Sequence, residues 1–387
     1  MDAFTKFVIT QKPHVLVIPG DLTFNGARLS HEDMVVLLSR VTLAGIPVLV
    51  IPGNHDVNCN QAASFEGNGY TLVESVDAGE FARMYGACGY DGSLCPQTIA
   101  RDEASLSYVW EYAPALRFLL VDVNAVESLG TVPEQTLAWI ERQLQDASRA
   151  QARVIAFSHQ SMLQQTFIDY GYKINNASEL LSLYKQYGVL ANFCGHLHLQ
   201  HYMIDEDGFL DVATSALSVS PCQYAYVRLY ANSSPGLLGQ DEKTGTSELT
   251  VQTDLNKGLR GPLVLTYETQ PFDEGVSAWA AEEGYTNPDL LDFATYARDF
   301  FRGNKRDDAV VWLESQGYAN AAELVDFSAQ VNYHYFTGTL NQMERRPDLV
   351  EQWADIDALT GYYMRYIFDM TPVRDENEIA LSCASLV

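Results

Sequence analysis

The chain has 387 residues, of which 47% are hydrophobic and 19% are charged, so it is typical of a globular protein of one large domain with an appendage, or of two domains. The formal net charge of −26 argues against a nucleic-acid backbone as a partner, because such binding requires a basic surface. A small phosphorylated substrate is compatible with this charge, since a bound divalent cation reverses the local sign.

The sequence leaves the cellular compartment and the oligomeric state open. No apolar run is long enough to cross a membrane, and the N-terminus has no export-signal layout. The sequence as written would be expected in the cytoplasm, and it would be exported or held in the cell envelope if a signal precedes Met1. Cys88 and Cys95 would form a small disulfide loop in an exported protein, although unpaired structural thiols are the favoured interpretation.

One hexapeptide, Val-Leu-Val-Ile-Pro-Gly, occurs twice, at Val15–Gly20 and Val48–Gly53. A short β-branched run ending at a Pro-Gly break is typical of a strand buried on both faces of a parallel sheet. Between the copies, helical spacing predicts a helix that starts at a capping box of Ser30 and Asp33 and stops at Gly45. A strand, helix and strand of this length predict a βαβ unit, so both strands should end at the same sheet edge.

The rest of the chain divides into an alternating part, a strand-rich part and a helical part. After a short helix at Asp77–Tyr85, further strands and helices are expected at Leu106–Glu111, Leu116–Val123, Pro133–Ala147, Arg153–Phe157, Ser178–Tyr187 and Val189–Cys194. Consecutive strands should follow at Tyr202–Asp205, Phe209–Ala213, Ala225–Leu229, Leu249–Thr253 and Leu263–Tyr267, with a surface loop at Ser233–Thr246. Helices are predicted at 287–303, Asp307–Gln316, Ala321–Phe336 and Asp348–Asp369. These patterns place a domain boundary near residue 270, with a helical subdomain over 271–387.

Four apolar runs end directly before residues that can bind a metal. These residues are Asp21, Asn54 with His55, His159, and His196 with His198. Neutral imidazoles together with carboxylate and amide oxygens suit Zn, Mn, Fe or similar divalent ions. Two such ions about 3.5–4 Å apart form a clamp for in-line displacement at phosphorus. All four groups are expected at one edge of the predicted sheet, so they indicate a metal site.

These motifs resemble those of a known family. Gly20-Asp21, Gly53-Asn54-His55-Asp56, the lone His159 and Gly195-His196-Leu197-His198 look, in this order, like the motifs of the calcineurin-like metallophosphoesterases. The resemblance covers about residues 1–270 and lies in the bacterial branch near the class III cyclic nucleotide phosphodiesterases. It implies an α/β fold, a four-layer α/β/β/α sandwich of two mixed sheets flanked by helices. It also implies hydrolysis of a phosphomonoester or phosphodiester at two divalent ions, with a metal-bound hydroxide attacking phosphorus directly.

The resemblance also implies a role for each metal ligand. Asp21 would bridge the two ions, and Asn54, His159 and His196 would complete the second site. His198 would belong to the first site.

Two further residues would act in catalysis without binding a metal. By the same resemblance, His55 would stabilise the transition state or protonate the leaving oxygen. Asp56 would orient His55 through a hydrogen bond.

The sequence departs from the family pattern at its start. The family carries an Asp-x-His motif at the end of its first strand, but no such motif precedes Asp21, and the chain begins with a predicted helix, Asp2–Gln11. The first site therefore keeps only Asp21 and His198. One hypothesis is that Met1 is an internal methionine and that the missing strand lies upstream. The alternative is a truncated or degenerate member that binds one ion or none and is weakly active or a non-catalytic binding protein.

Some other residues allow more than one interpretation. Ser161 follows His159, but no Gly-x-Ser-x-Gly elbow surrounds it, so a serine hydrolase is disfavoured. Asp122 and Asn124 follow an apolar strand and would either support the site or cap a loop. His201 is expected on a strand surface.

Overall fold

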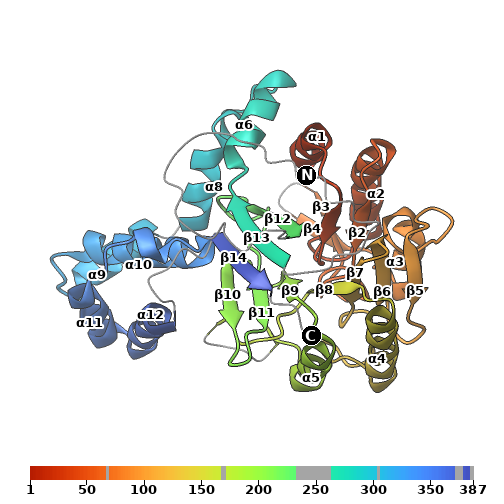
Figure 1. The fold of residues 1–387 in the computed structure, drawn as a ribbon. Coiled ribbons are helices and arrows are strands. Elements are labelled where there is room, and N and C mark those ends of the chain that lie inside the picture. Colours follow the sequence, from red (N-terminus) through yellow and green to blue (C-terminus); the bar gives the residue numbers. More distant parts are fainter. Residues whose placement is uncertain (67–68, 167–170, 232–262, 303–305, 371–377, 384–387) are drawn as a thin grey trace.

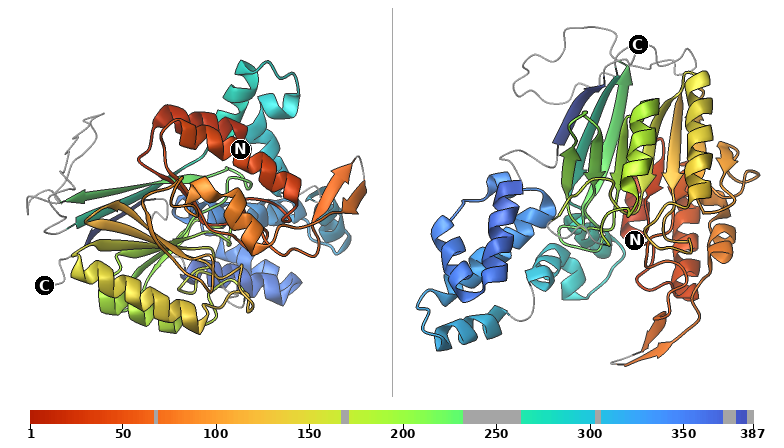
Figure 2. Two further views of the ribbon diagram at one scale, coloured as in Figure 1. Left: turned by 90° about the vertical axis from the view of Figure 1, so that its right-hand side faces the viewer. Right: turned by 90° about the horizontal axis from the view of Figure 1, so that it is seen from below.

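The computed structural model describes residues 1–66, 69–166, 171–231, 263–302, 306–370 and 378–383. Within these residues the N-terminal part forms four layers, in the order helices, sheets, sheet, helices (Figures 1 and 2). This arrangement confirms the predicted α/β/β/α architecture, and a helical region follows it toward the C-terminus.

The largest sheet has seven strands in the order β10-β11-β9-β8-β7-β6-β5. Its strands are β5 (Thr98–Arg101), β6 (Tyr108–Ala113), β7 (Leu116–Val121), β8 (Arg153–Ser158), β9 (Ala191–Cys194), β10 (His201–Ile204) and β11 (Leu210–Ala213). Strands β7, β8, β9 and β11 are parallel, and the outer strands run antiparallel to their neighbours. One face packs on α4 (Glu134–Arg149) and α5 (Ala177–Tyr187), while the other faces the core between the sheets.

The second sheet layer consists of two smaller sheets. Strands β1 (Leu16–Ile18) and β2 (Val48–Val50) pair in parallel, with Leu16 opposite Val48, as the repeated hexapeptide predicts. Strands β12 (Tyr224–Ala231), β13 (Leu263–Gln270) and β14 (Glu378–Cys383) form an antiparallel sheet. Both sheets contribute to the central core, and α1 (Asp2–Gln11) and α2 (Arg28–Leu43) pack on this side.

The start of α2 differs from the prediction. The helix begins at Arg28 after Ala27, whose backbone is extended, and no side chain caps it. Ser30 therefore lies inside the first turn, and the proposed capping box is wrong. A capping box occurs instead at α3 (Ala78–Met84), where Asp77 and Glu80 exchange side-chain and backbone hydrogen bonds.

The long connection from Val57 to Ser107 contains more structure than the predicted short helix alone. A hairpin of β3 (Ala63–Glu66) and β4 (Gly69–Leu72) precedes α3, and a single 3₁₀ turn at Gly86–Cys88 follows it. The hairpin stands away from the body of the protein (Figure 2). Cys88 and Cys95 are both buried free thiols, in agreement with the favoured interpretation.

The C-terminal region is mainly helical, as predicted. Its helices are α6 (Asp273–Glu282), α7 (Pro288–Leu291), α8 (Phe293–Arg302), α9 (Arg306–Ser315), α10 (Ala321–Thr337), α11 (Pro347–Ile356) and α12 (Ala358–Met370), with a 3₁₀ turn at Leu340–Gln342. The single helix predicted over Asp348–Asp369 is two helices, because the chain leaves helical geometry at Asp357, whose carboxylate accepts the backbone N–H of Thr360. The chain then returns to the small sheet as β14, a strand that the sequence analysis missed.

The predicted strand Leu249–Thr253 and the loop Ser233–Thr246 lie outside the described residues. No helix within the described ranges combines the length and the apolar character that a membrane span requires. The boundary near residue 270 stays a proposal.

Candidate metal centre

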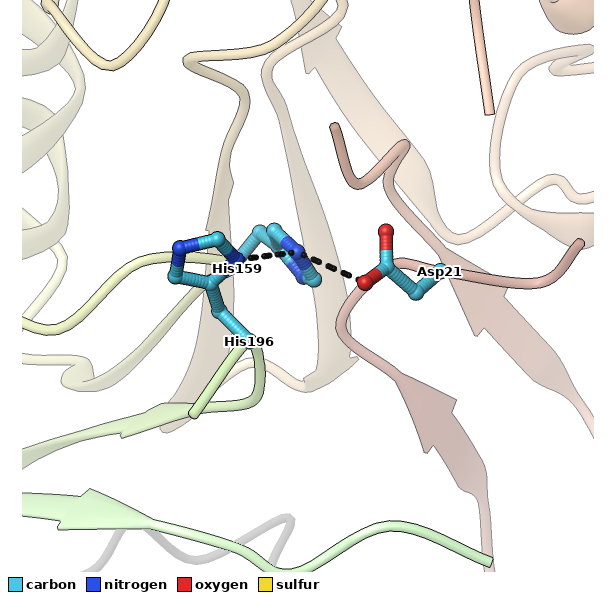
Figure 3. A group of neighbouring side chains, drawn as sticks. All are labelled: Asp21, His159 and His196. Carbon is cyan, nitrogen blue, oxygen red and sulfur yellow. Dashed lines mark hydrogen bonds and ion pairs between the residues drawn. The ribbon is translucent and has the colours of Figure 1, made fainter. Parts of the chain in front are cut away.

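The four strands that carry the predicted ligands end close together. Asp21 follows β1, Asn54 follows β2, His159 follows β8, and His196 follows β9. Figure 3 shows the Asp21 carboxylate and the His196 imidazole on either side of the His159 ring. Within the described part of the chain, Asp21, His159 and His196 form a group whose potential ligand atoms all lie within 4.8 Å of one another.

Nε2 of His159 lies at the centre of this group. It is 3.0 Å from Asn54 Oδ1, 3.2 Å from His196 Nδ1 and 3.3 Å from Asp21 Oδ2. Ligand atoms of a tetrahedral ion with bonds of about 2.0–2.1 Å are separated by roughly 3.3–3.4 Å. These three separations are close to those of neighbouring ligands of one ion, and the mixed nitrogen and oxygen donors suit a divalent ion.

The second nitrogen of each imidazole fixes its tautomer. His159 Nδ1 donates to the carbonyl oxygen of Pro19 at 2.8 Å, and His196 Nε2 donates to that of Gly171 at 2.9 Å. The remaining nitrogens, which face each other, therefore carry lone pairs in the neutral rings. Two lone pairs, a carboxylate and an amide oxygen repel one another unless a proton or a cation lies between them. Backbone carbonyls that orient histidines in this way are typical of metal sites.

The electrostatics keep negative charge on Asp21. Burial opposes its ionisation, but the hydrogen bond and charge of His159 outweigh burial and lower the pKa of Asp21 to about 2. Burial also works to lower the pKa of His159, yet the Asp21 carboxylate raises it overall. The pKa of His196 falls to about 4, first through burial and then through the neighbouring His159. A cation here would meet an ionised carboxylate and a neutral His196.

Two glycines allow the loops to approach closely. A Cβ atom at Gly53 would overlap the Asp21 carboxylate and backbone nitrogen, and one at Gly20 would overlap Nδ1 of His159. Gly20 also has a φ of +102°, in the region that favours glycine. The Pro-Gly breaks of the two hexapeptides therefore provide the room in which the ligands meet.

His198 and His55 lie near Asp21 but outside the compact group. Burial lowers the pKa of His198. The charge of Asp21 acts to raise this pKa, while His159 and His55 act to lower it. The backbone N–H of His55 donates to Asp21 Oδ1 at 3.1 Å, and its side chain is exposed. The two oxygens of the Asp21 carboxylate therefore have different neighbours. Oδ2 faces the candidate ligand group, and Oδ1 accepts the backbone N–H of His55.

Asp56 does not orient His55, which corrects the expected hydrogen bond. Its buried carboxylate accepts the backbone N–H groups of Leu22, Thr23 and Gly53 and the Thr23 hydroxyl, at 2.8–3.1 Å. Asp56 thus joins the loop after β1 to the loop after β2 and holds the Asp21 and Asn54 segments together.

Sequence reasoning missed Gln160 and Asp211 as supporting residues, whereas Asn124 was expected either to support the site or to cap a loop. Gln160 exchanges two hydrogen bonds with Asn124, whose Nδ2 also donates to the carbonyl oxygen of Pro52. Asp211 lies fully buried in β11 and accepts the N–H groups of Met162 and Leu163, just after His159. An acidic residue inside an apolar strand was the available signal for Asp211.

The remaining polar candidates have structural contacts. Asp122 accepts three backbone N–H groups, those of Leu106, Asn124 and Ala125, and therefore caps loops. His201 is buried and lies 2.9 Å from Gln165 Oε1, so the expected surface position is wrong.

The C-terminal helices pack directly behind the His196 loop. Leu197 and Leu199 are buried in one cluster with side chains of α9, α10, α11 and α12. The backbone N–H of Gln200 donates to the carbonyl oxygen of Phe336 at 2.8 Å. The helical region thereby supports one wall of the candidate metal centre.

Comparison with family models identifies this arrangement. The model described as calcineurin-like phosphoesterase matches residues 1–200, just over half of the chain. The chain belongs to this family. A second model, the C-terminal domain of cyclic nucleotide phosphodiesterase, matches residues 275–367. These matches confirm the resemblance to metallophosphoesterases near the cyclic nucleotide phosphodiesterases.

Curated relatives carry related names. The chain is 26% identical over 194 residues to glycerophosphodiester phosphodiesterase GpdQ of Enterobacter lignolyticus (strain SCF1), covering 49% of this chain and 58% of that protein. It is 27% identical over 193 residues to a probable glycerophosphodiester phosphodiesterase GpdQ of Arcobacter nitrofigilis, covering 48% and 57%. The match thus spans less than two thirds of each relative.

Solved structures of similar fold include two phosphatases. A dimetal phosphatase from Danio rerio has 17% identity and a TM-score of 0.40, covering 55% of this chain and 76% of that chain. The purple acid phosphatase PPD1 from yellow lupin (Lupinus luteus) has 16% identity and a TM-score of 0.41, covering 69% and 46%.

Proposed function

We propose that the protein hydrolyses a small phosphomonoester or phosphodiester by in-line attack of water on phosphorus. The observation that carries this proposal is the convergence of three potential ligand atoms, Asn54 Oδ1, His196 Nδ1 and Asp21 Oδ2, on Nε2 of His159 at 3.0–3.3 Å. The names of the curated relatives and of the C-terminal family model favour a diester.

The residues of the candidate site would have separate roles in metal binding and in proton or hydrogen-bond donation. Asp21, Asn54, His159 and His196 would hold a divalent ion such as Mn, Zn or Fe. The ion, when bound, would activate a water molecule and polarise the phosphoryl oxygens. His55 is exposed next to Asp21, where it would donate a hydrogen bond to a phosphoryl oxygen or a proton to the leaving oxygen.

The number of ions is a separate part of the proposal. His198 lies outside the compact group, and with Asp21 it would supply two ligands, fewer than the three that catalytic sites usually have. We infer one firmly held ion and low turnover for the chain as given. A protein that binds one ion without turnover is the competing function.

The test compares the unaltered protein with His196→Ala. Metal content by mass spectrometry and hydrolysis of p-nitrophenyl phosphate and bis(p-nitrophenyl) phosphate are measured with Mn, Zn or Fe(II) added. We expect one ion per chain and measurable hydrolysis, and we expect His196→Ala to reduce both metal affinity and rate by about 100-fold or more. The matched control is His14→Ala, which removes an exposed histidine before β1, at the opposite end of that strand.

Each outcome distinguishes the alternatives. Two firmly held ions with rapid turnover would refute the one-ion inference. One ion with no hydrolysis would favour the binding protein. Equal activity in His196→Ala and His14→Ala would overturn the assignment of the site.

A further inference from the structure

An uncovered apolar surface begins at His55 and runs along the β3–β4 hairpin. It consists of Phe24, Phe65, Tyr70 and Leu72, here called the apolar strip. Their exposed fractions are 77%, 62%, 67% and 67%. Contiguous exposed apolar side chains, unlike single ones, indicate a binding surface.

Ring contacts and strand register show that the strip is continuous. The Phe24 ring lies 6.2 Å from the His55 ring, at 15° between the planes, and 6.4 Å from the Phe65 ring. Phe65 is paired across the hairpin with Tyr70, and their rings are 6.2 Å apart. Leu72 is two residues beyond Tyr70 and therefore lies on the same face.

The opposite face of the hairpin is polar. Alternation along the two strands places Ser64 and Thr71 there. The hairpin is thus a two-sided ribbon whose apolar side adjoins the candidate catalytic histidine. A two-stranded ribbon gains little stability by itself, so an exposed apolar face of this kind is explained by what it binds.

Hydrogen bonds hold the strip in a fixed position relative to the metal centre. The Asp56 carboxylate accepts the backbone N–H of Thr23, directly before Phe24, at 2.9 Å. Nδ2 of Asn25, directly after Phe24, donates to the carbonyl oxygen of Ala63 in β3 at 3.2 Å. One short segment therefore connects the loop of Asp21 to the hairpin.

We propose that the apolar strip binds an extended apolar group on the alcohol of the phosphoester substrate. This inference rests on the proposed function, because it places phosphorus at the Asp21 group and the substituent past His55. A substituent that leaves the site on that side meets Phe24 first, and a longer one reaches Phe65 and Tyr70. The substrate class is then a phosphodiester with an alkyl or aryl chain rather than a wholly polar one.

Substrates that differ only in chain length test the strip. The protein is given methyl and hexyl p-nitrophenyl phosphate as soluble monomers, and kcat/KM is measured for each. We expect the hexyl ester to be favoured by about tenfold or more, mainly through KM, because each CH₂ removed from water adds to binding. Phe65→Ser should bring the ratio of the two values close to one, and Phe65→Leu should retain most of it.

The matched control is Leu43→Ser, which removes an even more exposed apolar side chain, 86% exposed, at the end of α2. It should keep the ratio of the unaltered protein. Titration calorimetry with methylphosphonate and hexylphosphonate in the presence of Mn measures the same preference without turnover.

The outcomes separate this inference from the proposed function. If both esters are hydrolysed with nearly equal kcat/KM, the strip does not bind the substituent and this inference is wrong, while the proposed hydrolase function is retained. Preferential binding of hexylphosphonate without hydrolysis would support the strip and refute the hydrolase. If Phe65→Ser converts a dimer into a monomer in light scattering and leaves the ratio unchanged, the strip is a contact between copies and the inference is wrong.

Discussion

Three of the predicted ligands have a backbone conformation that L-residues rarely adopt. The φ angles are +54° at Asp21, +65° at His196 and +53° at His198, all in the left-handed region. Non-glycine residues in this region cost about 1–2 kcal/mol each and concentrate at functional sites. The shared strain of His196 and His198 supports a common functional role for the loop after β9.

This strain predicts an unusual order of stability at residue 198. The free energy of unfolding, measured in urea, should be about 1 kcal/mol higher for His198→Gly than for His198→Ala, because only glycine adopts the left-handed conformation freely. The control is the exposed helical position Val36, where the order should reverse and glycine should be the less stable by about 1 kcal/mol. Equal stability of the two variants at residue 198 would contradict the strain.

The close approach of the loops predicts a second effect at the residue scale. Gly53→Ala adds a methyl group that overlaps both Asp21 and the His159 ring, so the spacing of these two candidate ligands must change. We expect metal affinity, measured by titration calorimetry, to fall by about 10-fold or more. Gly92→Ala, where a Cβ meets no atom within 4 Å, should keep the affinity of the unaltered protein.

The sequence could predict the ligands but not the residues that hold them. Asp21 and His159 each follow an apolar strand, so their neighbourhood follows from parallel topology alone. The role of Asp56 depends on where the N–H groups of Leu22 and Thr23 point after folding, more than thirty residues away along the chain. No local pattern contains that information, and the family resemblance predicted the wrong hydrogen-bond partner for Asp56, the His55 side chain.

At the scale of elements, the loop after β9 has two faces. The charge of Asp21 acts to raise the pKa of His196 and of His198, which therefore lie on the Asp21 side of the loop. Leu197 and Leu199 are buried among the C-terminal helices. The alternation means that the packing of the helical region determines where the imidazoles lie.

A pair of core substitutions separates packing from ligand placement. Leu197→Ala and Leu313→Ala both remove a buried leucine from the same cluster, and each should cost about 2–4 kcal/mol of unfolding free energy. Only Leu197→Ala should also weaken metal binding, since residue 197 lies between the two histidines. The result that contradicts this view is an equal loss of metal affinity in both variants.

Element boundaries were predicted where one local signal dominates. Asn287 and Pro288 begin α7 as expected, because the Asn287 side chain accepts the N–H of Asp289, but the single helix predicted over 287–303 is divided at Asp292 into α7 and α8. The break at Asp357 was missed, since the apolar periodicity continues across it. A side-chain cap of this kind is visible in the sequence only as an aspartate, a residue that is equally common on helix surfaces.

At the scale of the whole molecule, the candidate metal centre connects distant parts of the fold. Its four residues follow four strands of two sheets, and the helical region supports the last of them. Such a site exists only in the folded chain, so ion binding stabilises the native state over the unfolded state.

We therefore expect the melting temperature to rise with the logarithm of Mn or Zn concentration and to fall on addition of a chelator. An ion at 100 times its dissociation constant stabilises the fold by about 2.7 kcal/mol. The net charge of −26 complicates this test, because any dication reduces self-repulsion of the protein. Mg provides that screening but prefers an octahedral set of oxygens, and His196→Ala keeps the charge while removing a ligand.

A specific site requires that Mn or Zn stabilise the unaltered protein well beyond Mg and that the excess disappear in His196→Ala. If Mg raised the melting temperature as much as Mn and Zn, or if the variant responded fully, the stabilisation would come from screening and the four-ligand site would lose its support.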